Sequence, residues 1–337
     1  MKQCMDYWKV THPDAVTCYL CPHECVIKEG KRGLCRVREN QGNVLYNMIY
    51  GKYTAVSIDP VEKKPLYHFY PGSDLVSVGF TGCSLHCGYC INNKIVHDTA
   101  ITDCKEIDFL TIYDYMSESD AIGVAFTFSE PLMNIEWLID FSKNFRECFG
   151  TSKKLVLVTN GVIDFQFEPV RRLLTLIDAV NLDYKGSAYF YKTVCGCVVD
   201  PEKLLLEWIS FCAMYNVHLE ISCMIIPGLT DKSEELLHDL KQVFVYNKAV
   251  ELGKSIPIHI ASYIRSYHLR HIDPTPESII KAMYKAVKQH TPFVYLENTK
   301  YPECASTVCP ACNQVLIERN NYDVTVHSEF PTPLFKE

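Results

Sequence analysis

Residues 75–90 read LVSVGFTGCSLHCGYC, an apolar β-rich run followed at once by three cysteines. Cys83, Cys87 and Cys90 are separated by three and then two residues, so one loop can wrap a compact metal centre. Thiolates are soft ligands that suit zinc or an iron–sulfur cluster. A structural zinc site needs a fourth ligand, such as His86, whereas a cubane with three cysteines keeps one iron open. The spacing, and the place at the C-terminal end of a strand, favour the cluster.

Short β-rich runs alternate with segments of helical period from about residue 75 onward. The runs are LVSVGF (75–80), IGVAFTF (122–128), KLVLVTN (154–160), IDAVNLDY (177–184), NVHLEISCMII (216–226), IPIHIASY (256–263) and FVYLEN (293–298). This alternation is typical of parallel βα units and predicts an α/β fold. A doubly wound sheet and a full or partial (β/α) barrel both fit it, and periodicity alone does not choose between them.

Two of the intervening helices have recognisable starts. Asp200 can cap a helix whose first turn takes Pro201, and Thr275 and Pro276 are placed in the same way. The apolar residues aligned on one side of the first helix are Leu204, Leu205, Trp208, Ile209 and Cys212. Those of the second are Ile279, Met283, Ala286 and Val287. We expect both faces to pack as core.

The composition excludes several classes of function. The 337 residues carry a formal net charge of −7 without a basic tract, so we expect no nucleic-acid partner. No apolar run approaches the roughly 18 residues of a spanning helix, and the first residues lack a secretory signal, so we expect a soluble cytoplasmic chain without a membrane partner. Seventeen cysteines in a reducing compartment indicate metal or redox chemistry rather than disulfides.

Four cysteines near the N-terminus form a second group. Their spacings of two, three and nine residues suffice for a four-thiolate site that holds either zinc or an auxiliary Fe–S cluster. The four are Cys18, Cys21, Cys25 and Cys35. Residues 1–50 have no long apolar period, and we interpret them as a loop-built, metal-binding module. The scattered cysteines, interpreted as small buried hydrophobic residues, are Cys4, Cys104, Cys148, Cys195, Cys197, Cys212 and Cys223.

A C-P-A-C knuckle at Cys309 and Cys312 marks the C-terminal segment, residues 301–337. No cysteine follows it, so a metal site there would need Cys304 and His327, or two of the N-terminal thiolates. Free thiols are the plain alternative. We expect the rest of the segment to form a short hairpin and a loose tail.

The cluster loop resembles that of the radical S-adenosylmethionine (SAM) enzymes, in which an aromatic residue, here Tyr89, precedes the third cysteine. Six further motifs resemble the AmmeMemoRadiSam radical enzymes, relatives of pyruvate formate-lyase activating enzyme. They are CYLCPHECVI (18–27), DPVEKKPLYHFYPGS (59–73), TFSEP (127–131), NLDYKG (181–186), MIIPG (224–228) and VCPAC (308–312). The resemblance covers residues 18 to about 325. It implies a partial (β/α)6 TIM-like barrel over residues 51–300, with small Cys-rich appendages at both ends.

The resemblance also implies a chemistry. A [4Fe–4S] cluster on Cys83, Cys87 and Cys90 would bind the amino and carboxylate groups of SAM at its open iron, with Tyr89 beside these cofactors. One electron from a reductant such as ferredoxin or flavodoxin then cleaves SAM to methionine and a 5′-deoxyadenosyl radical, which abstracts a hydrogen from the substrate. The protein positions the cofactors and excludes water and oxygen.

Ser129, Glu130 and Pro131 occupy the place of the family's Gly-Gly-Glu-Pro strand end, whose backbone and Glu bind the SAM amino group. The two glycines are Phe128 and Ser129 here. This departs from the wider family but matches the closer subfamily. Taken alone, a Glu before Pro at a strand end is more often a charge at a helix N-terminus.

Three more strands supply SAM contacts by resemblance. Thr159 and Asn160 end one strand and are similar to a SAM contact, with a turn cap as the alternative. Asp183 and Lys185 share one face of a strand. The resemblance implies that Lys185 meets the SAM carboxylate with support from Asp183, and an internal ion pair is the alternative. His259 matches a ribose-side histidine, although a lone buried histidine is more often structural.

Two branches stay open within this interpretation. One is an activase that installs a glycyl radical in a partner protein. The other is direct chemistry on a small molecule or peptide, alongside Memo-like and AMMECR1-like proteins. We favour the second because the shortest activases lack the four-Cys module. A hypothesis of another class is a non-catalytic Fe–S or zinc protein for electron transfer or scaffolding, which predicts four protein ligands and no response to SAM.

Overall fold

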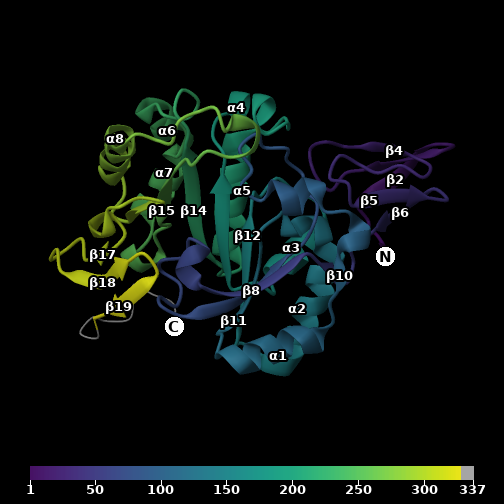
Figure 1. Ribbon diagram of the computed structural model, residues 1–337, viewed down its shortest axis with the longest axis horizontal. Helices are drawn as coiled ribbons and strands as arrows, with labels where there is room; N and C mark the ends of the chain where they lie inside the picture. The colour runs from purple at the N-terminus through teal and green to yellow at the C-terminus, as the bar shows by residue number, and fades with distance from the viewer. Residues whose placement is uncertain (328–337) are drawn as a thin grey trace.

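An eight-stranded sheet forms the centre of the computed structural model, which describes residues 1–327 (Figure 1). Its order is β16-β15-β14-β13-β12-β11-β9-β8. The strands are β8 (Ala55–Pro60), β9 (Asp74–Gly79), β11 (Gly123–Thr127), β12 (Lys154–Thr159), β13 (Ala179–Tyr184), β14 (His218–Ile225), β15 (Ile258–Ser262) and β16 (Val294–Glu297). All seven predicted runs are strands and run parallel, while β8 pairs antiparallel with β9. The fold is a partial barrel of the predicted type, and its parallel strands number seven rather than six.

The two faces of the sheet pack against different partners. Apolar side chains such as Val78, Phe126 and Leu157 join the large core under the helices. The helices are α1 (Phe109–Ser119), α2 (Ile135–Phe149), α3 (Glu168–Leu174), α4 (Ala188–Thr193), α5 (Pro201–Met214), α6 (Ser233–Asp239), α7 (Lys241–Ala249) and α8 (Glu277–Lys288). On the inner face, Leu75 and Val156 pack with the segment after β8. That segment therefore fills one end of the barrel interior.

The structure confirms the predicted N-terminal cap of α5 but not that of α8. The Asp200 carboxylate accepts a hydrogen bond from the Lys203 N–H at 3.1 Å, and α5 buries the predicted face. At α8 the predicted cap is wrong. The Thr275 hydroxyl instead donates to the Ile225 carbonyl at 2.5 Å and accepts from the Tyr263 N–H at 2.8 Å. Thr275 thus joins the ends of β14 and β15, and α8 begins without a side-chain cap.

The N-terminal residues form two three-stranded antiparallel sheets, β2-β3-β4 and β1-β6-β5. The strands are β1 (Lys2–Gln3), β2 (Trp8–His12), β3 (Ala15–Cys18), β4 (Val26–Lys28), β5 (Arg38–Gln41) and β6 (Val44–Asn47). This is more regular than the predicted loop-built module. Strands of two to five residues are too short to show a period of two in the sequence. A further pair, β7 (Lys52–Tyr53) with β10 (Lys105–Glu106), follows.

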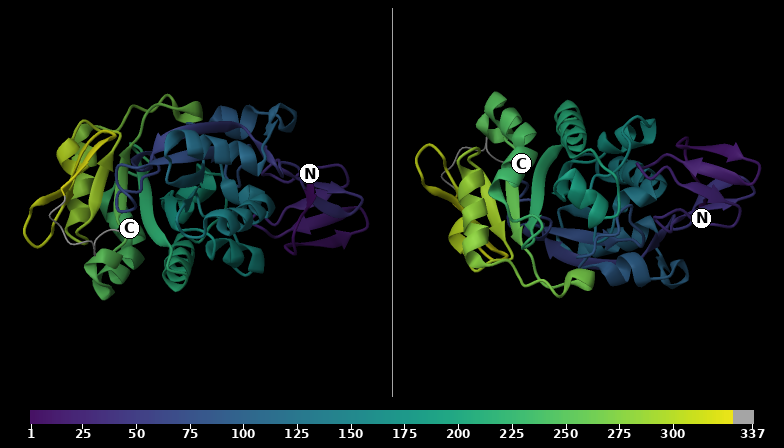
Figure 2. Two further views of the ribbon diagram at one scale, coloured as in Figure 1. Left: turned by 90° about the horizontal axis from the view of Figure 1, so that it is seen from below. Right: turned by 90° about the horizontal axis from the view of Figure 1, so that it is seen from above.

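The C-terminal strands form a small sheet of their own, at the opposite end of the molecule from the N-terminal sheets (Figures 1 and 2). They are β17 (Thr307–Val308), β18 (Val315–Asn320) and β19 (Asp323–Val326). The predicted hairpin is confirmed in β18 and β19, and the predicted tail lies outside the described residues. Because the two ends are far apart, Cys309 and Cys312 do not join the N-terminal thiols.

Single turns connect the larger elements. They are η1 (Val61–Lys63), η2 (Lys94–Asp98), η3 (Ile101–Asp103), η4 (Pro131–Asn134), η5 (Leu252–Lys254), η6 (Tyr267–Leu269) and η7 (Pro302–Cys304). Among residues 1–327, no helix has the length and apolar character needed to cross a membrane.

Candidate active site

A cavity of about 180 Å³ opens at the C-terminal ends of β11 to β14, beside the loop that follows β9. Ten of the residues predicted to bind the cluster or SAM line it. They are Cys83, Cys87, Tyr89, Cys90, Ser129, Glu130, Thr159, Asn160, Asp183 and Lys185. Pro131 and His259 are not among the lining residues. The fold thus gathers side chains from four separate segments around one space.

The three cysteines of the cluster loop differ in their surroundings. Cys83 Sγ accepts hydrogen bonds from the Leu85 N–H at 3.3 Å and from Asn160 Nδ2 at 3.4 Å. Burial raises the pKa of the Cys83 thiol, and it raises that of Cys90 to about 11. The pKa of Cys87 is lowered, first by a hydrogen bond from Cys195 and also by the charge of Lys185. Cys87 therefore has the greatest thiolate character of the three.

Glu130 is a fully buried carboxylate in the cavity wall. Its Oε1 accepts from the Thr159 hydroxyl at 2.7 Å and the Leu132 N–H at 3.1 Å, and its Oε2 accepts from the Asn160 N–H at 2.8 Å. Burial raises the pKa of Glu130 to about 7. The Leu132 contact is the cap of η4, as the plainer sequence alternative expects. The same side chain also ties the end of β11 to the end of β12 and faces the cavity.

Phe128, which stands in place of the first of two glycines, keeps a backbone conformation that glycine adopts easily. Phe128 has a φ of 66°, in the left-handed region that side chains other than Gly, Asn and Asp rarely adopt. Ser129 lines the cavity, and its buried Oγ has no hydrogen-bond partner among the described residues. A buried hydroxyl without a partner is costly, so it is ready for a polar ligand.

Asp183 and Lys185 form an ion pair at the end of β13. The Lys185 side chain is 10% exposed and that of Asp183 is 43% exposed. Burial alone would lower the pKa of Lys185, but the charges of Asp183 and Cys87 outweigh it and raise the pKa. Lys185 Nζ also lies 5.8 Å from the centre of the Tyr89 ring. A buried ammonium therefore stays charged at the cavity wall.

The chain is similar in sequence to a known protein family and to a protein of another organism. Residues 71–188 match the family described as a 4Fe-4S single cluster domain. MJ0808, an uncharacterized protein of Methanocaldococcus jannaschii, is 34% identical over 328 residues, which cover 97% of this chain and 94% of that protein. The chain belongs to the same family as MJ0808. The matching model describes a domain that carries a single [4Fe–4S] cluster.

Solved structures with a similar arrangement are distant in sequence. A domain of a pyruvate-formate lyase-activating enzyme from Bacteroides vulgatus has a TM-score of 0.39 and 16% identity, over 52% of this chain and 98% of its own. SuiB from Streptococcus suis, solved with S-adenosylmethionine, has a TM-score of 0.48 and 12% identity, over 72% of this chain and 55% of its own.

The side chains around the cavity fit a polynuclear cluster. Three thiols of one loop face a single cavity, and two N–H donors reach Cys83 Sγ. Iron–sulfur clusters are held by thiolates and are tuned by such hydrogen bonds. Among residues 1–327, no three His, Cys, Asp or Glu side chains stand close enough together to hold a single metal ion.

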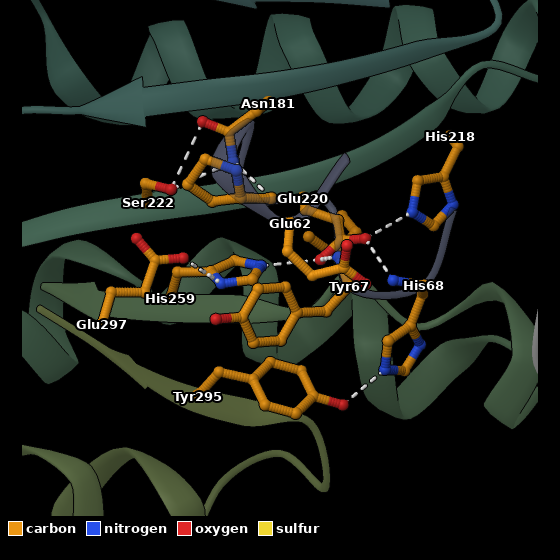
Figure 3. A network of polar contacts seen from close by, with 12 residues as sticks. Glu62, Tyr67, His68, Asn181, His218, Glu220, Ser222, His259, Tyr295 and Glu297 are labelled. Atoms are coloured by element: carbon orange, nitrogen blue, oxygen red, sulfur yellow. Dashed lines mark hydrogen bonds and ion pairs between the residues drawn. The ribbon is translucent and has the colours of Figure 1, made fainter. Parts of the chain in front are cut away.

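His259 lies in the barrel interior rather than at the cavity (Figure 3). Its ring is fully buried, with Nε2 at 2.7 Å from Glu220 Oε2 and Nδ1 at 2.7 Å from Glu297 Oε1. Burial alone would lower the pKa of His259, but Glu297 and Glu220 raise it to about 9. Glu220 also accepts from the backbone N–H groups of Tyr67 and His68. The structure thus gives His259 a place in a network that holds the segment after β8.

The four N-terminal cysteines lie near enough to influence one another's pKa, although no three of them are close enough to hold a single metal ion. Burial raises the pKa of Cys18 to about 12 and raises that of Cys21, with a smaller contribution from the other thiols of the group. The module packs against the cluster loop, because His23 Nε2 lies 2.7 Å from the Ser84 carbonyl oxygen. A Cβ at Gly82 would lie 2.7 Å from the Cys35 carbonyl oxygen, so only glycine fits there.

The C-terminal knuckle is a hairpin turn in which the Cys309 N–H donates to the Gln314 carbonyl at 2.8 Å. The backbone N–H groups of Cys312 and Ala311 lower the pKa of Cys309. The two residues proposed to complete a metal site have other neighbours. Cys304 contacts Tyr284 of α8, and His327 lies 3.9 Å from Glu318.

Two residues near the cavity were not predicted from the sequence to belong to the site. Lys64 is 2% exposed, and its Nζ lies 2.8 Å from Asp59 Oδ2 and 5.1 Å from the centre of the Phe128 ring. Cys195 is fully buried against Cys87. The available signal for Cys195 was its position in V-C-G-C, shortly after the D-Y-K-G motif on the same connection.

Proposed function

We propose that this chain is a radical SAM enzyme of the AmmeMemoRadiSam type, with its [4Fe–4S] cluster on Cys83, Cys87 and Cys90. When bound, the cluster and SAM supply a 5′-deoxyadenosyl radical that abstracts a hydrogen from a small-molecule or peptide substrate. The observation that carries the proposal is the single cavity that gathers the three thiols with Glu130 and Lys185. A pure electron carrier has no use for these charged side chains beside its cluster.

The residues of the cavity wall have complementary charges for an amino acid. The Glu130 carboxylate and the unpartnered Ser129 Oγ would accept hydrogen bonds from the ammonium group of SAM. Lys185 would pair with the SAM carboxylate, and Asp183 keeps Lys185 charged and oriented. Thr159 and Asn160 orient the Glu130 carboxylate, because the Thr159 hydroxyl and the Asn160 N–H donate hydrogen bonds to its oxygens. Tyr89 lines the cavity beside Lys185.

The N-terminal thiols are the proposed second metal site. Zinc or an auxiliary cluster on Cys18, Cys21, Cys25 and Cys35 would brace the module that packs on the cluster loop. Metal analysis of the Cys21→Ala variant against the wild type tests this: a loss of zinc, or of iron beyond the first cluster, is the expected result. We also propose that Cys309 and Cys312 contribute to a metal site at the C-terminal knuckle. The same metal analysis of the Cys309→Ala variant tests this.

The catalytic proposal is tested by anaerobic reconstitution with iron and sulfide, followed by incubation with SAM and dithionite. We expect the wild type to release 5′-deoxyadenosine and the Cys87→Ala variant to release none. Cys148→Ala, which removes an exposed thiol on α2, is the matched control and should behave as the wild type. If the wild type formed no more 5′-deoxyadenosine than Cys87→Ala, the enzymatic proposal would be wrong. In the cell, a one-electron donor such as ferredoxin or flavodoxin would replace dithionite.

A further inference from the structure

The loop after α4 is paired with the cluster loop through the backbone. The His86 N–H donates to the Cys195 carbonyl at 2.8 Å, and the Gly88 N–H donates to the Val194 carbonyl at 3.0 Å. These two hydrogen bonds lie on either side of Cys87 in the sequence. The main chain of residues 194–195 is therefore fixed beside the middle ligand of the proposed cluster.

The Cys195 side chain is held between this pairing and the body of the protein. It is fully buried and does not line the cavity, whereas Cys87 does. Its thiol is hydrogen-bonded to the Cys87 sulfur, and the Tyr89 side chain is hydrogen-bonded to both. A Cys87 that ligates iron carries no proton, so Cys195 would be the donor of this hydrogen bond. The left-handed Gly196, with a φ of 73°, turns the chain back so that the Cys197 N–H reaches the Tyr191 carbonyl at 3.0 Å.

The same short helix fixes the proposed SAM contact and this thiol. Ser187, two residues after Lys185, caps α4 by accepting a hydrogen bond from the Phe190 N–H. The Tyr191 hydroxyl accepts from the Lys185 N–H at 3.2 Å, and Cys195 follows the last turn. Cys195 is thus held next to Cys87 by the backbone of this connection and does not line the cavity.

We propose that the Cys195 thiol donates a hydrogen bond to the Cys87 sulfur and thereby raises the reduction potential of the cluster. The inference rests on the proposed function, since it requires that Cys87 is a cluster ligand. Reduction adds one electron and breaks no bond, and the added negative charge spreads onto the ligand sulfurs. A donor stabilises the reduced cluster more than the oxidised one, because hydrogen bonds to more negative acceptors are stronger. Cys195 is a positioning residue that acts through Cys87 and takes no part in ligation.

The test compares four anaerobically reconstituted proteins without SAM: the wild type, Cys195→Ala, Cys195→Ser and Cys212→Ala. Each is titrated with a mediator-coupled reductant, and the reduced cluster is followed by electron paramagnetic resonance. We expect equal iron contents and a shift of the midpoint to more negative potential in Cys195→Ala. Cys195→Ser keeps a donor and should stay nearer to the wild type. Cys212→Ala removes a buried thiol of α5 and should not shift.

Proton electron–nuclear double resonance (ENDOR) spectroscopy of the reduced cluster gives a second readout. After exchange into D2O, the wild type should lose one more exchangeable proton coupling than Cys195→Ala. Equal midpoints, or equal exchangeable couplings, would overturn the inference. Loss of iron in both Cys195 variants would also overturn it, since Cys195 would then be needed for ligation or folding. If the wild type itself bound no [4Fe–4S] cluster, the failure would be that of the proposed function.

Discussion

Phe128 shows how the active-site edge of β11 is held in a strained backbone conformation. Its φ of 66° costs an L-residue roughly 1–2 kcal/mol that glycine does not incur. The ring lines the cavity and covers the buried Lys64 ammonium at 5.1 Å. The strained backbone thus persists where a ring separates a buried charge from the proposed cofactor site.

This strain predicts that, at position 128, a glycine variant is more stable than an alanine variant, the reverse of the usual order within a strand. Phe128→Gly and Phe128→Ala both lose the ring, but only the alanine keeps the left-handed strain. We expect Phe128→Gly to have the larger free energy of unfolding, by about 1 kcal/mol, in urea unfolding of the apoprotein. Phe126 on the same strand has no positive φ and serves as the control, so there the glycine variant should be the less stable one. An alanine variant at position 128 as stable as the glycine variant would contradict the assignment of strain.

The ion pair of Asp183 and Lys185 predicts that replacing Asp183 destabilises the protein more than replacing Lys185. Lys185 is 10% exposed and Asp183 is 43% exposed, so an unpaired lysine is harder to hydrate than an unpaired aspartate. Asp183→Asn should therefore lower the free energy of unfolding by about 2 kcal/mol. Lys185→Met should lower it by less than about 1 kcal/mol. Thermal unfolding without SAM measures both, and a greater loss in Lys185→Met would argue against a buried, charged lysine.

At the level of the elements, the inner face of the barrel is unusually polar below the cavity. Glu220 on β14 accepts four hydrogen bonds, from His218, His259 and the N–H groups of Tyr67 and His68 (Figure 3). A carboxylate satisfied in this way can stay ionised in the interior, because each lone pair has a donor. The network therefore anchors the segment after β8 inside the barrel and closes the side opposite the cavity.

The charge of His259 predicts a pH dependence of stability. Its folded pKa of about 9 lies above the ordinary 6.5, so the protonated form is bound more tightly in the folded chain. The stabilisation is fully present below pH 6.5 and is lost as the pH rises through 9. The expected loss is about 3 kcal/mol. The free energy of unfolding from pH 6 to 10 should fall less steeply in His259→Gln than in the wild type, and equal slopes would contradict a charged His259.

The central sheet could be predicted from the sequence because long apolar runs alternate with helical segments in a clear pattern. The places of several site residues in the fold could not be predicted in this way. Alternation along β15 gives the face of His259 but not its height in the barrel, and pairing with Ser222 places it below the cavity. Two adjacent lysines look like a solvated edge, yet Lys64 is buried because Asp59 lies five residues earlier on β8. Cys195 looked like a scattered core cysteine, and only the fold of the connection after β13 brings it to Cys87.

On the scale of the whole molecule, a buried polar cluster helps to attach the N-terminal sheets to the barrel. Arg38 of β5 and Glu136 of α2 are 1% and 0% exposed, with Arg38 Nη2 at 3.2 Å from Glu136 Oε2. Asn47 Nδ2 donates to Glu136 Oε2 at 2.8 Å, and the Tyr7 hydroxyl donates to Oε1. Arg38 also donates to the Met133 carbonyl at 2.6 Å. The module that packs on the cluster loop is thus fixed by protein contacts as well as by any metal.

This attachment predicts strong coupling between the two halves of the ion pair. Arg38→Met leaves Glu136 buried without its cation, and Glu136→Gln leaves the Arg38 cation without its anion. Each should cost about 3–5 kcal/mol of unfolding free energy. In the double variant neither charge stays unpaired, so its loss should be well below the sum of the two. Urea unfolding measures the cycle, and the rate of proteolysis within residues 1–50 should rise in both single variants because the module detaches first. Additive losses would mean that Arg38 and Glu136 are not coupled, and unchanged proteolysis would mean that the module is held mainly by other contacts.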